Sequence, residues 1–281
     1  MSRWRKSDLA RLELETHEYP RRGLMQTNAR NMLRRLAPPL ILDLYRKIRN
    51  QAIRKGTRRE SPTTDENPEL PKLPWRDAVG GMWDEIGRLQ LEFMVSQGLL
   101  PYHPLLDVGC GSLRGGVHFA RYLRDGHYYG IDAQQWLLDA GVQFELPRAG
   151  LGNRRVHLLC RDDFLVSEFG TIFDFAIAQS LFTHLTWNSI LRCLCNISGV
   201  LGPAGRFFAT FFEDLDGTHQ TSPLSHGPTG TVSYPDRDPY HYPFSVLTEL
   251  AQRSGLTAQY IGEWNHPRGQ MMMALSLLRQ A

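Results

Sequence analysis

The chain has 281 residues, of which 42% are hydrophobic and 22% are charged, and this composition is typical of a globular protein with one sizeable core. No apolar run approaches the roughly 18 residues of a membrane span, and no apolar stretch follows the basic first residues, so we expect neither a transmembrane protein nor a secretory signal. The four cysteines match the spacing of neither a zinc site nor a disulfide framework, which predicts reduced thiols, a cytoplasmic location and no bound metal.

Basic residues are concentrated at the N-terminal end of the chain. Residues 1–60 hold 16 Lys and Arg against 6 Asp and Glu, whereas the remainder holds 16 against 23. We predict a basic, partly helical N-terminal extension over residues 1–60 and a Pro- and Ser-containing linker over residues 61–79. Within the extension, residues 38–55 have apolar side chains at helical spacing. This helix either contacts an anionic membrane surface from the cytoplasmic side or packs its apolar face on its own domain.

A second domain is predicted over residues 80–281, beginning with an amphipathic helix over residues 82–97. Leu105 and Leu106 then begin a buried strand, which leads through a glycine-rich turn into a helix over residues 116–123. Glycines in that turn allow backbone angles that a side chain would forbid, and they let a ligand approach the main chain. A strand, a glycine turn and a helix in this order are typical of a nucleotide-like binding site in an open α/β sheet.

The turn segment, Asp107-Val-Gly-Cys-Gly-Ser112, resembles the first motif of class I S-adenosylmethionine-dependent methyltransferases. The dinucleotide fingerprint G-x-G-x-x-G competes for the same glycines, but here an acid precedes the first glycine and three residues separate the second from the next. The resemblance implies S-adenosylmethionine as the cofactor. It places four residues of the motif in the cofactor site, namely Asp107, Gly109, Cys110 and Gly111.

Asp132 ends the second predicted strand, residues 127–132. An acid at the tip of this strand is where a ribose diol binds, because one carboxylate can accept hydrogen bonds from two hydroxyls. The neighbouring Ala133 belongs to the same predicted site. As an alternative, Asp132 caps the helix that begins near residue 134.

A third strand, residues 154–159, is followed by two acids and an aromatic residue. In the family that the chain resembles, an acid at this place meets the adenine amino group. Asp162 and Asp163 both qualify, and the sequence does not choose between them. Phe164 either stacks on the base or fills the core.

The fourth predicted strand, residues 173–180, is nearly all apolar, as expected for a central parallel strand. The resemblance places Gln179 and Ser180, at its end, between methyl donor and acceptor. His184 follows, either as a general base for a hydroxyl acceptor or as a structural hydrogen-bonding residue. Arg114, in the glycine turn, either pairs with the methionine carboxylate of the cofactor or is a surface arginine.

The rest of the chain predicts a helix over residues 187–201, a fifth strand over residues 206–213 and a helix over residues 244–254. A closing pair of strands is expected over residues 257–263 and 270–278. Between the fifth strand and the last helix, residues 214–243 are rich in His and Tyr, and we predict an acceptor-side loop there. The predicted fold is α/β: a Rossmann-like, seven-stranded, mostly parallel sheet with an antiparallel final strand and helices on both faces.

These patterns predict a methyltransferase that acts on a small-molecule acceptor, such as a sugar hydroxyl of a glycan or of a lipid-linked precursor. Two alternatives stand beside it. One is a protein or RNA methyltransferase that docks through its basic extension, although the net acidic remainder of the chain disfavours nucleic acid. The other is a module that binds S-adenosylmethionine without turnover. The sequence does not determine the oligomeric state.

Overall fold

The computed structural model describes residues 73–278, which belong to a compact unit that spans residues 63–281. The predicted basic extension, its helix over residues 38–55 and the first part of the predicted linker lie outside the described residues. Among residues 73–278, no helix is both long and apolar enough to cross a membrane.

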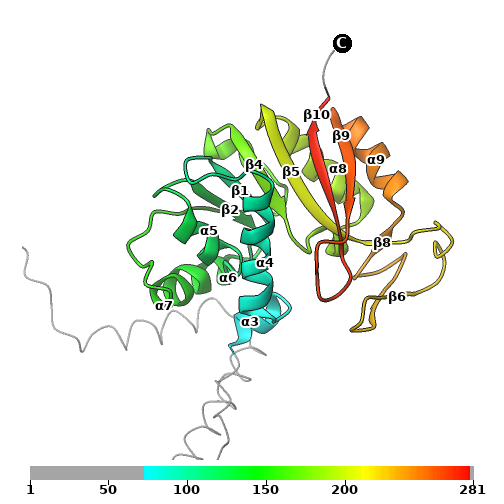
Figure 1. Ribbon diagram of the computed structural model, residues 1–281, viewed down its shortest axis with the longest axis horizontal. Helices are drawn as coiled ribbons and strands as arrows, with labels where there is room; N and C mark the ends of the chain where they lie inside the picture. Colours follow the sequence, from blue (N-terminus) through cyan, green and yellow to red (C-terminus); the bar gives the residue numbers. More distant parts are fainter. Residues whose placement is uncertain (1–72, 279–281) are drawn as a thin grey trace, which may run out of the picture. The chain divides into compact units, whose positions relative to one another are not determined.

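A mixed sheet forms the centre of the molecule, with seven strands in the order β3-β2-β1-β4-β5-β10-β9 (Figure 1). β10 runs antiparallel to both of its neighbours, and the other pairs are parallel. The predicted fold class is therefore confirmed. The strands are β1 (Leu105–Val108), β2 (Tyr128–Asp132), β3 (His157–Cys160), β4 (Phe173–Ala178), β5 (Leu201–Glu213), β9 (Leu256–Gly262) and β10 (Met271–Leu277).

Helices lie on both faces of this sheet (Figure 1). The α-helices are α3 (Pro74–Ala78), α4 (Trp83–Ser96), α5 (Gly116–Tyr122), α6 (Gln135–Ala140), α7 (Leu146–Arg148), α8 (Trp187–Ser198) and α9 (Phe244–Arg253). A π-helical turn η1 (Gly141–Glu145) joins α6 to α7, and two short 3-10 helices follow β3 and β4 as η2 (Val166–Phe169) and η3 (Phe182–His184).

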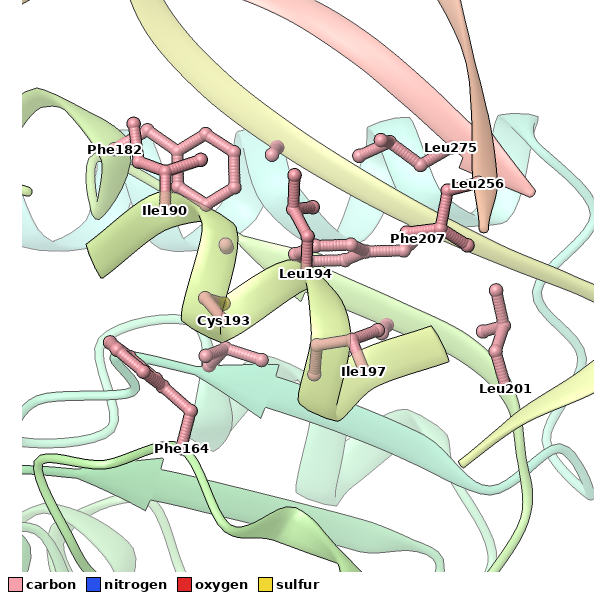
Figure 2. Close-up of a cluster of buried hydrophobic side chains, with 14 of the residues drawn as sticks. Phe164, Phe182, Ile190, Cys193, Leu194, Ile197, Leu201, Phe207, Leu256 and Leu275 are labelled. Carbon is pink, nitrogen blue, oxygen red and sulfur yellow. The ribbon is translucent and has the colours of Figure 1, made fainter. Parts of the chain in front are cut away.

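Alternation of side chains along the strands produces two cores. Leu106 and Val108 of β1 point into the core under α8 and α9, whereas Leu105 points into the core under α4 and α5. On α8, four fully buried side chains recur at helical spacing and pack on the sheet, namely Ile190, Cys193, Leu194 and Ile197 (Figure 2). Burying each large apolar side chain of this kind contributes about 1.5–3 kcal/mol, so these side chains hold α8 against the sheet.

Two segments differ from the predicted boundaries within the sheet. β5 begins at Leu201 and not at residue 206, because residues 202–205, which the sequence indicates as a turn, form an irregularity in the pairing with β4. A Cβ atom at Gly205 would lie 2.8 Å from the carbonyl oxygen of Phe173, so glycine is needed there. β3 begins three residues later than predicted, at His157.

The last part of the predicted linker packs on the domain. Residues 74–78 form α3, and Trp75 is buried and stacks on Phe144 with ring centroids 4.8 Å apart. Trp75 Nε1 donates to Glu145 Oε1 at 2.6 Å, and Arg76 Nη2 forms an ion pair with Glu145 Oε2 at 2.5 Å. These contacts position the segment between α3 and α4, which lines the site described below.

The predicted loop over residues 214–243 contains short strands. β6 (Leu224–His226) and β7 (Thr231–Ser233) form an antiparallel hairpin. β8 (His241–Tyr242) pairs in parallel with the end of β5, which adds an eighth strand to the sheet. The segment is thus a folded wall beside the carboxyl end of β5 (Figure 1).

Candidate active site

A cavity of about 720 Å³ opens at the carboxyl ends of β1, β2 and β4. The strand order reverses between β1 and β4, and ligands bind at such a reversal in open α/β sheets. The cavity wall includes ten of the thirteen residues predicted for the site, namely Gly109, Gly111, Arg114, Asp132, Ala133, Asp162, Phe164, Gln179, Ser180 and His184. Asp107, Cys110 and Asp163 do not line it.

The glycine turn is held against the end of β2. Gly109 and Gly111 have φ angles of +75° and +54°, in the left-handed region that favours glycine. The backbone N–H of Gly111 donates to Asp132 Oδ2 at 2.9 Å, and that of Gln134 donates to Asp132 Oδ1 at 2.9 Å. Asp132 therefore both receives an N–H at the start of α6 and faces the cavity. Burial raises the pKa of Asp132, while the two backbone N–H groups oppose that shift.

Asp107 and Cys110 lie beneath the turn and not in the cavity wall. Tyr128 donates its hydroxyl to Asp107 Oδ2 at 2.8 Å. Burial raises the pKa of Asp107 to about 7 and places that of the Cys110 thiol well above its ordinary range. Their contacts support the turn from the core side.

The structure separates the two acids after β3. Asp163 accepts both Arg161 Nε at 2.8 Å and Arg161 Nη2 at 2.6 Å, and this pairing holds the pKa of Asp163 well below its usual range. Asp162 is exposed and lines the cavity. Phe164 also lines it, is 8% exposed, and has a φ of +61°, which is uncommon for a bulky residue. Of the three residues predicted after β3, Asp162 and Phe164 thus face the cavity and Asp163 does not.

Two arginines face the same cavity from its other end. Arg114 is 6% exposed, and its guanidinium donates to the carbonyl oxygens of Val79 and Gly81 and to Gln179 Oε1, at 2.7, 2.9 and 2.6 Å. Arg268 donates to the carbonyl oxygen of Gly80 at 2.5 Å. Burial, together with the nearby Arg268 cation, lowers the pKa of Arg114 to about 10. Because all of these acceptors are uncharged, the two cations create a site that favours an anionic group.

Gln179 and Ser180 begin a polar network at the end of β4. Gln179 Oε1 accepts a hydrogen bond from Arg114, so the Gln179 amide nitrogen donates to Ser180 Oγ at 2.5 Å; the same nitrogen lies 3.1 Å from His266 Nε2. Ser180 Oγ donates in turn to Gln270 Oε1 at 3.0 Å. Burial, Arg114 and Arg268 lower the pKa of His266 to about 3, so its ring is neutral. The network fixes the side chains between the two ends of the cavity.

His184 pairs with an acid that the sequence does not single out. Its Nδ1 lies 2.6 Å from Asp238 Oδ1, and both residues line the cavity. The His184 side chain is 55% exposed, so it is accessible to a ligand. A carboxylate at Nδ1 holds the proton there and leaves Nε2 as a hydrogen-bond acceptor. The arrangement can therefore accept a proton from a hydroxyl.

Several residues of the wall come from segments without a sequence signal. Val79 ends the predicted linker, Gly80 begins the predicted domain, and Asp238 lies in the predicted loop. Trp83, on α4, is buried in the core, and the guanidinium of Arg76 lies 4.4 Å from the centroid of its ring. The tryptophan and arginine after residue 74 were the available signal that this segment packs on the domain.

No family model matches the sequence. Solved structures with a similar fold include an S-adenosylmethionine-dependent methyltransferase from Clostridium acetobutylicum, with a TM-score of 0.53, 11% identity, and coverage of 72% of this chain and 94% of that one. The CcbJ methyltransferase from Streptomyces caelestis gives a TM-score of 0.54 at 14% identity, over 69% and 90%. Magnesium protoporphyrin IX methyltransferase from Synechocystis, with bound S-adenosylhomocysteine (SAH), gives a TM-score of 0.50 at 15% identity, with coverage of 72% of this chain and 91% of that one. The chain therefore has the Rossmann-like fold of class I S-adenosylmethionine-dependent methyltransferases.

Proposed function

We propose that this chain is a methyltransferase that transfers the methyl group of S-adenosylmethionine to a hydroxyl of a small-molecule acceptor such as a sugar. One observation carries the proposal: a single cavity brings together the Asp132 carboxylate, the two arginines with uncharged acceptors and the His184–Asp238 pair. The fold supports it, as does the bound SAH in the Synechocystis structure.

The residues of the cavity fit the parts of this cofactor. Asp132 has lone pairs left after its two backbone N–H partners, so it can accept the ribose hydroxyls. Asp162 is the acid for the adenine amino group, and Phe164 lies beside it in the cavity wall. Arg114 and Arg268 supply the positive charge for the methionine carboxylate. A nicotinamide dinucleotide carries a pyrophosphate, for which the glycine turn would have to be free, but here the Gly111 N–H is bound to Asp132.

The bound cofactor supplies a methyl group on a positively charged sulfur, so the leaving group needs no further activation. The protein holds the acceptor in line with that methyl group and excludes water, and such positioning can contribute about 7–11 kcal/mol. His184 Nε2 would take the proton of the acceptor hydroxyl during this transfer, and Asp238 would stabilise the resulting imidazolium.

The proposal is tested by calorimetry with S-adenosylhomocysteine, followed by transfer of a labelled methyl group to a set of sugars. We expect S-adenosylhomocysteine to bind at one site and NADH to show no binding. Binding of NADH without binding of S-adenosylhomocysteine would refute the cofactor assignment. Binding of S-adenosylhomocysteine with no transfer to any acceptor would instead support the non-catalytic alternative.

A further inference from the structure

A second cavity, which we call the acidic chamber, lies at the carboxyl end of β5. It has a volume of about 480 Å³ and is lined by residues 213–216, 219, 224–228, 263–266 and 269–271. The hairpin of β6 and β7 is packed tightly on the turn before β10, because a Cβ atom at Gly227 would lie 2.8 Å from the backbone nitrogen of Gly269. The folded wall over residues 214–243 therefore creates this chamber.

The lining of the acidic chamber is rich in hydrogen-bond acceptors. Its four carboxyl side chains are those of Glu213, Asp214, Asp216 and Glu263, and no lysine or arginine between residues 73 and 278 lines it. Two of the four are already partnered, since Tyr260 donates its hydroxyl to Glu213 Oε2 and the backbone N–H of His219 donates to Asp214 Oδ2 at 3.0 Å. No group of three or more His, Cys, Asp or Glu within the described part is arranged to hold a metal ion.

A buried imidazole supplies an independent sign of a ligand. His226 is 7% exposed, lines the chamber, and stacks on Phe212 with ring centroids 4.5 Å apart. Its Nε2 lies 2.6 Å from Ser233 Oγ, while its Nδ1 has no partner among residues 73–278. Every fully enclosed polar side-chain atom in the described part of the chain has a hydrogen-bond partner. Nδ1 must therefore be open to the chamber that the ring lines.

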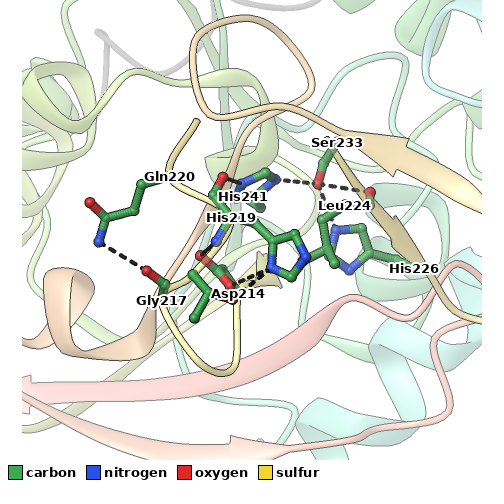
Figure 3. Close-up of polar contacts among 9 residues, drawn as sticks. Asp214, Gly217, His219, Gln220, Leu224, His226, Ser233 and His241 are labelled. Atoms are coloured by element: carbon green, nitrogen blue, oxygen red, sulfur yellow. Dashed lines mark hydrogen bonds and ion pairs between the residues drawn. The ribbon is translucent and has the colours of Figure 1, made fainter. Parts of the chain in front are cut away.

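The hydrogen-bond chain behind His226 determines which of its nitrogens carries the proton (Figure 3). His241 Nε2 lies 3.0 Å from the carbonyl oxygen of His219 and must donate to it. His241 is 4% exposed and has no carboxylate in hydrogen-bond contact, so we assign Ser233 Oγ as the donor to its Nδ1 at 2.7 Å, with the Leu224 carbonyl oxygen as a more distant acceptor at 3.5 Å. Ser233 then receives the proton of His226 Nε2, and His226 Nδ1 presents a lone pair. Burial, with His241 nearby, lowers the pKa of His226 to about 4, so the ring stays neutral near pH 7.

Carboxylates together with a bare imidazole nitrogen call for a ligand that donates hydrogen bonds and carries positive charge. We infer that the acidic chamber binds the ammonium group of the methyl acceptor, which is an amine-bearing polyhydroxyl compound such as an amino sugar. An ammonium has three donors and no acceptor, which matches this lining. Leu215, Leu224 and Trp264 provide apolar surface for the carbon skeleton. The inference rests on the proposed function, and it names the acceptor class for that reaction.

The two cavities adjoin at a common wall, and the inference requires that one acceptor span it. Gln270 lines each of them, and the amide nitrogen of Gln179, in the first cavity, lies 3.1 Å from His266 Nε2 in the second. Gln270 is 4% exposed, and its amide nitrogen has no partner within residues 73–278 although its Oε1 is bonded to Ser180 and Thr210. That nitrogen can donate to an acceptor oxygen at the common wall. Carboxylates keep an amine protonated, so its lone pair is not free for methylation, and a hydroxyl near His184 is the methylated group.

The experiment measures binding of matched sugar pairs to the full chain saturated with S-adenosylhomocysteine. A set of amino sugars and aminocyclitols is compared with their neutral N-acetylated counterparts by saturation-transfer NMR and calorimetry at neutral pH. We expect the ammonium forms to bind about tenfold tighter or more, because one charge-assisted hydrogen bond contributes about 1.5–3 kcal/mol. The same preference should appear as transfer of the labelled methyl group to oxygen.

Charge-neutralising variants locate the site. Asp216 and Glu263 are exposed, so the double variant Asp216→Asn/Glu263→Gln is expected to fold, which its melting temperature checks. We expect it to lose the preference for ammonium forms, whereas Glu249→Gln, on the exposed face of α9, should keep it. Equal binding of charged and neutral members, no binding of any member, or an unchanged preference in the double variant would overturn the inference. Because S-adenosylhomocysteine binding is measured separately, these outcomes leave the proposed function standing, and its failure would show as loss of that binding.

Discussion

Asp132→Asn tests the cofactor assignment most directly. The two backbone N–H groups that Asp132 accepts, from Gly111 and Gln134, are each 2.9 Å from a different carboxylate oxygen. A carboxylate has about four lone-pair sites, so about two remain for ribose hydroxyls. Asparagine keeps one oxygen, and its NH₂ group must face either an N–H donor or the ligand.

The expected loss follows from this change in acceptors. Losing one hydrogen bond to a charged group removes about 1.5–3 kcal/mol, which corresponds to roughly 10-fold to 150-fold weaker binding of S-adenosylhomocysteine. Calorimetry at neutral pH measures it. Since burial raises the pKa of Asp132, protonation on acidification should weaken wild-type binding at a higher pH than for an ordinary aspartate, whereas the variant should show no such step.

Asp139→Asn is the matched control, because Asp139 is an acid on α6 that accepts a hydrogen bond at 2.8 Å from Gln135 of the same helix. It should leave both affinity and melting temperature unchanged. If Asp132→Asn folds normally and binds S-adenosylhomocysteine within about twofold of wild type, that is within about 0.4 kcal/mol, the ribose assignment is wrong.

Four further substitutions probe the rest of the site and the support beneath the glycine turn. His184→Gln should lower turnover by roughly 10²- to 10⁴-fold with S-adenosylhomocysteine affinity nearly intact, and Asp238→Asn should lower turnover by a smaller factor. Arg114→Gln should weaken S-adenosylhomocysteine more than adenosine, which lacks the carboxylate, and calorimetry measures that ratio. The pKa of Asp107 is about 7 in the folded chain against about 3.9 in the unfolded chain. Its stabilising contribution is therefore full at acid pH and is lost as the pH rises to about 7. Asp107→Asn should remove this loss and raise the free energy of unfolding near pH 8 by at most about 4 kcal/mol.

A specific result would contradict the prediction for His184, for Arg114 and for Asp107. Wild-type turnover in His184→Gln would end its role as base. An equal loss for S-adenosylhomocysteine and adenosine would assign Arg114 to the fold alone. Denaturant unfolding of wild type and Asp107→Asn that shows the same pH dependence would mean that Asp107 is ionised in the folded chain at neutral pH.

Local pattern was sufficient for the strands of the central sheet and for two glycines of the turn. Apolar alternation and turn residues predicted the strands because each signal lies within a few neighbouring positions. Gly109, Gly111 and Asp132 were predictable since they occupy fixed places at strand ends. Asp162 and Asp163 were not distinguishable, because the choice depends on the direction of the Arg161 side chain.

Contacts between distant segments were beyond local reasoning. Asp238 meets His184 across 54 positions, within a segment whose hairpin and short strand follow no clear apolar alternation. Val79 and Gly80 enter the wall because Arg114 and Arg268 bind backbone carbonyls there, and such acceptors carry no sequence signature.

Gln270 links the energetics of the two cavities. Its side-chain oxygen Oε1 accepts hydrogen bonds from the hydroxyls of both Ser180 and Thr210. Its backbone carbonyl oxygen accepts one from Trp264 Nε1 at 3.0 Å. Residues that share a partner in this way rarely have additive mutational effects. Efforts to redesign acceptor choice will therefore disturb donor binding unless this glutamine is kept. In libraries that vary the walls of both cavities, the effects of substitutions should be measured in pairs, one from each wall, and not singly.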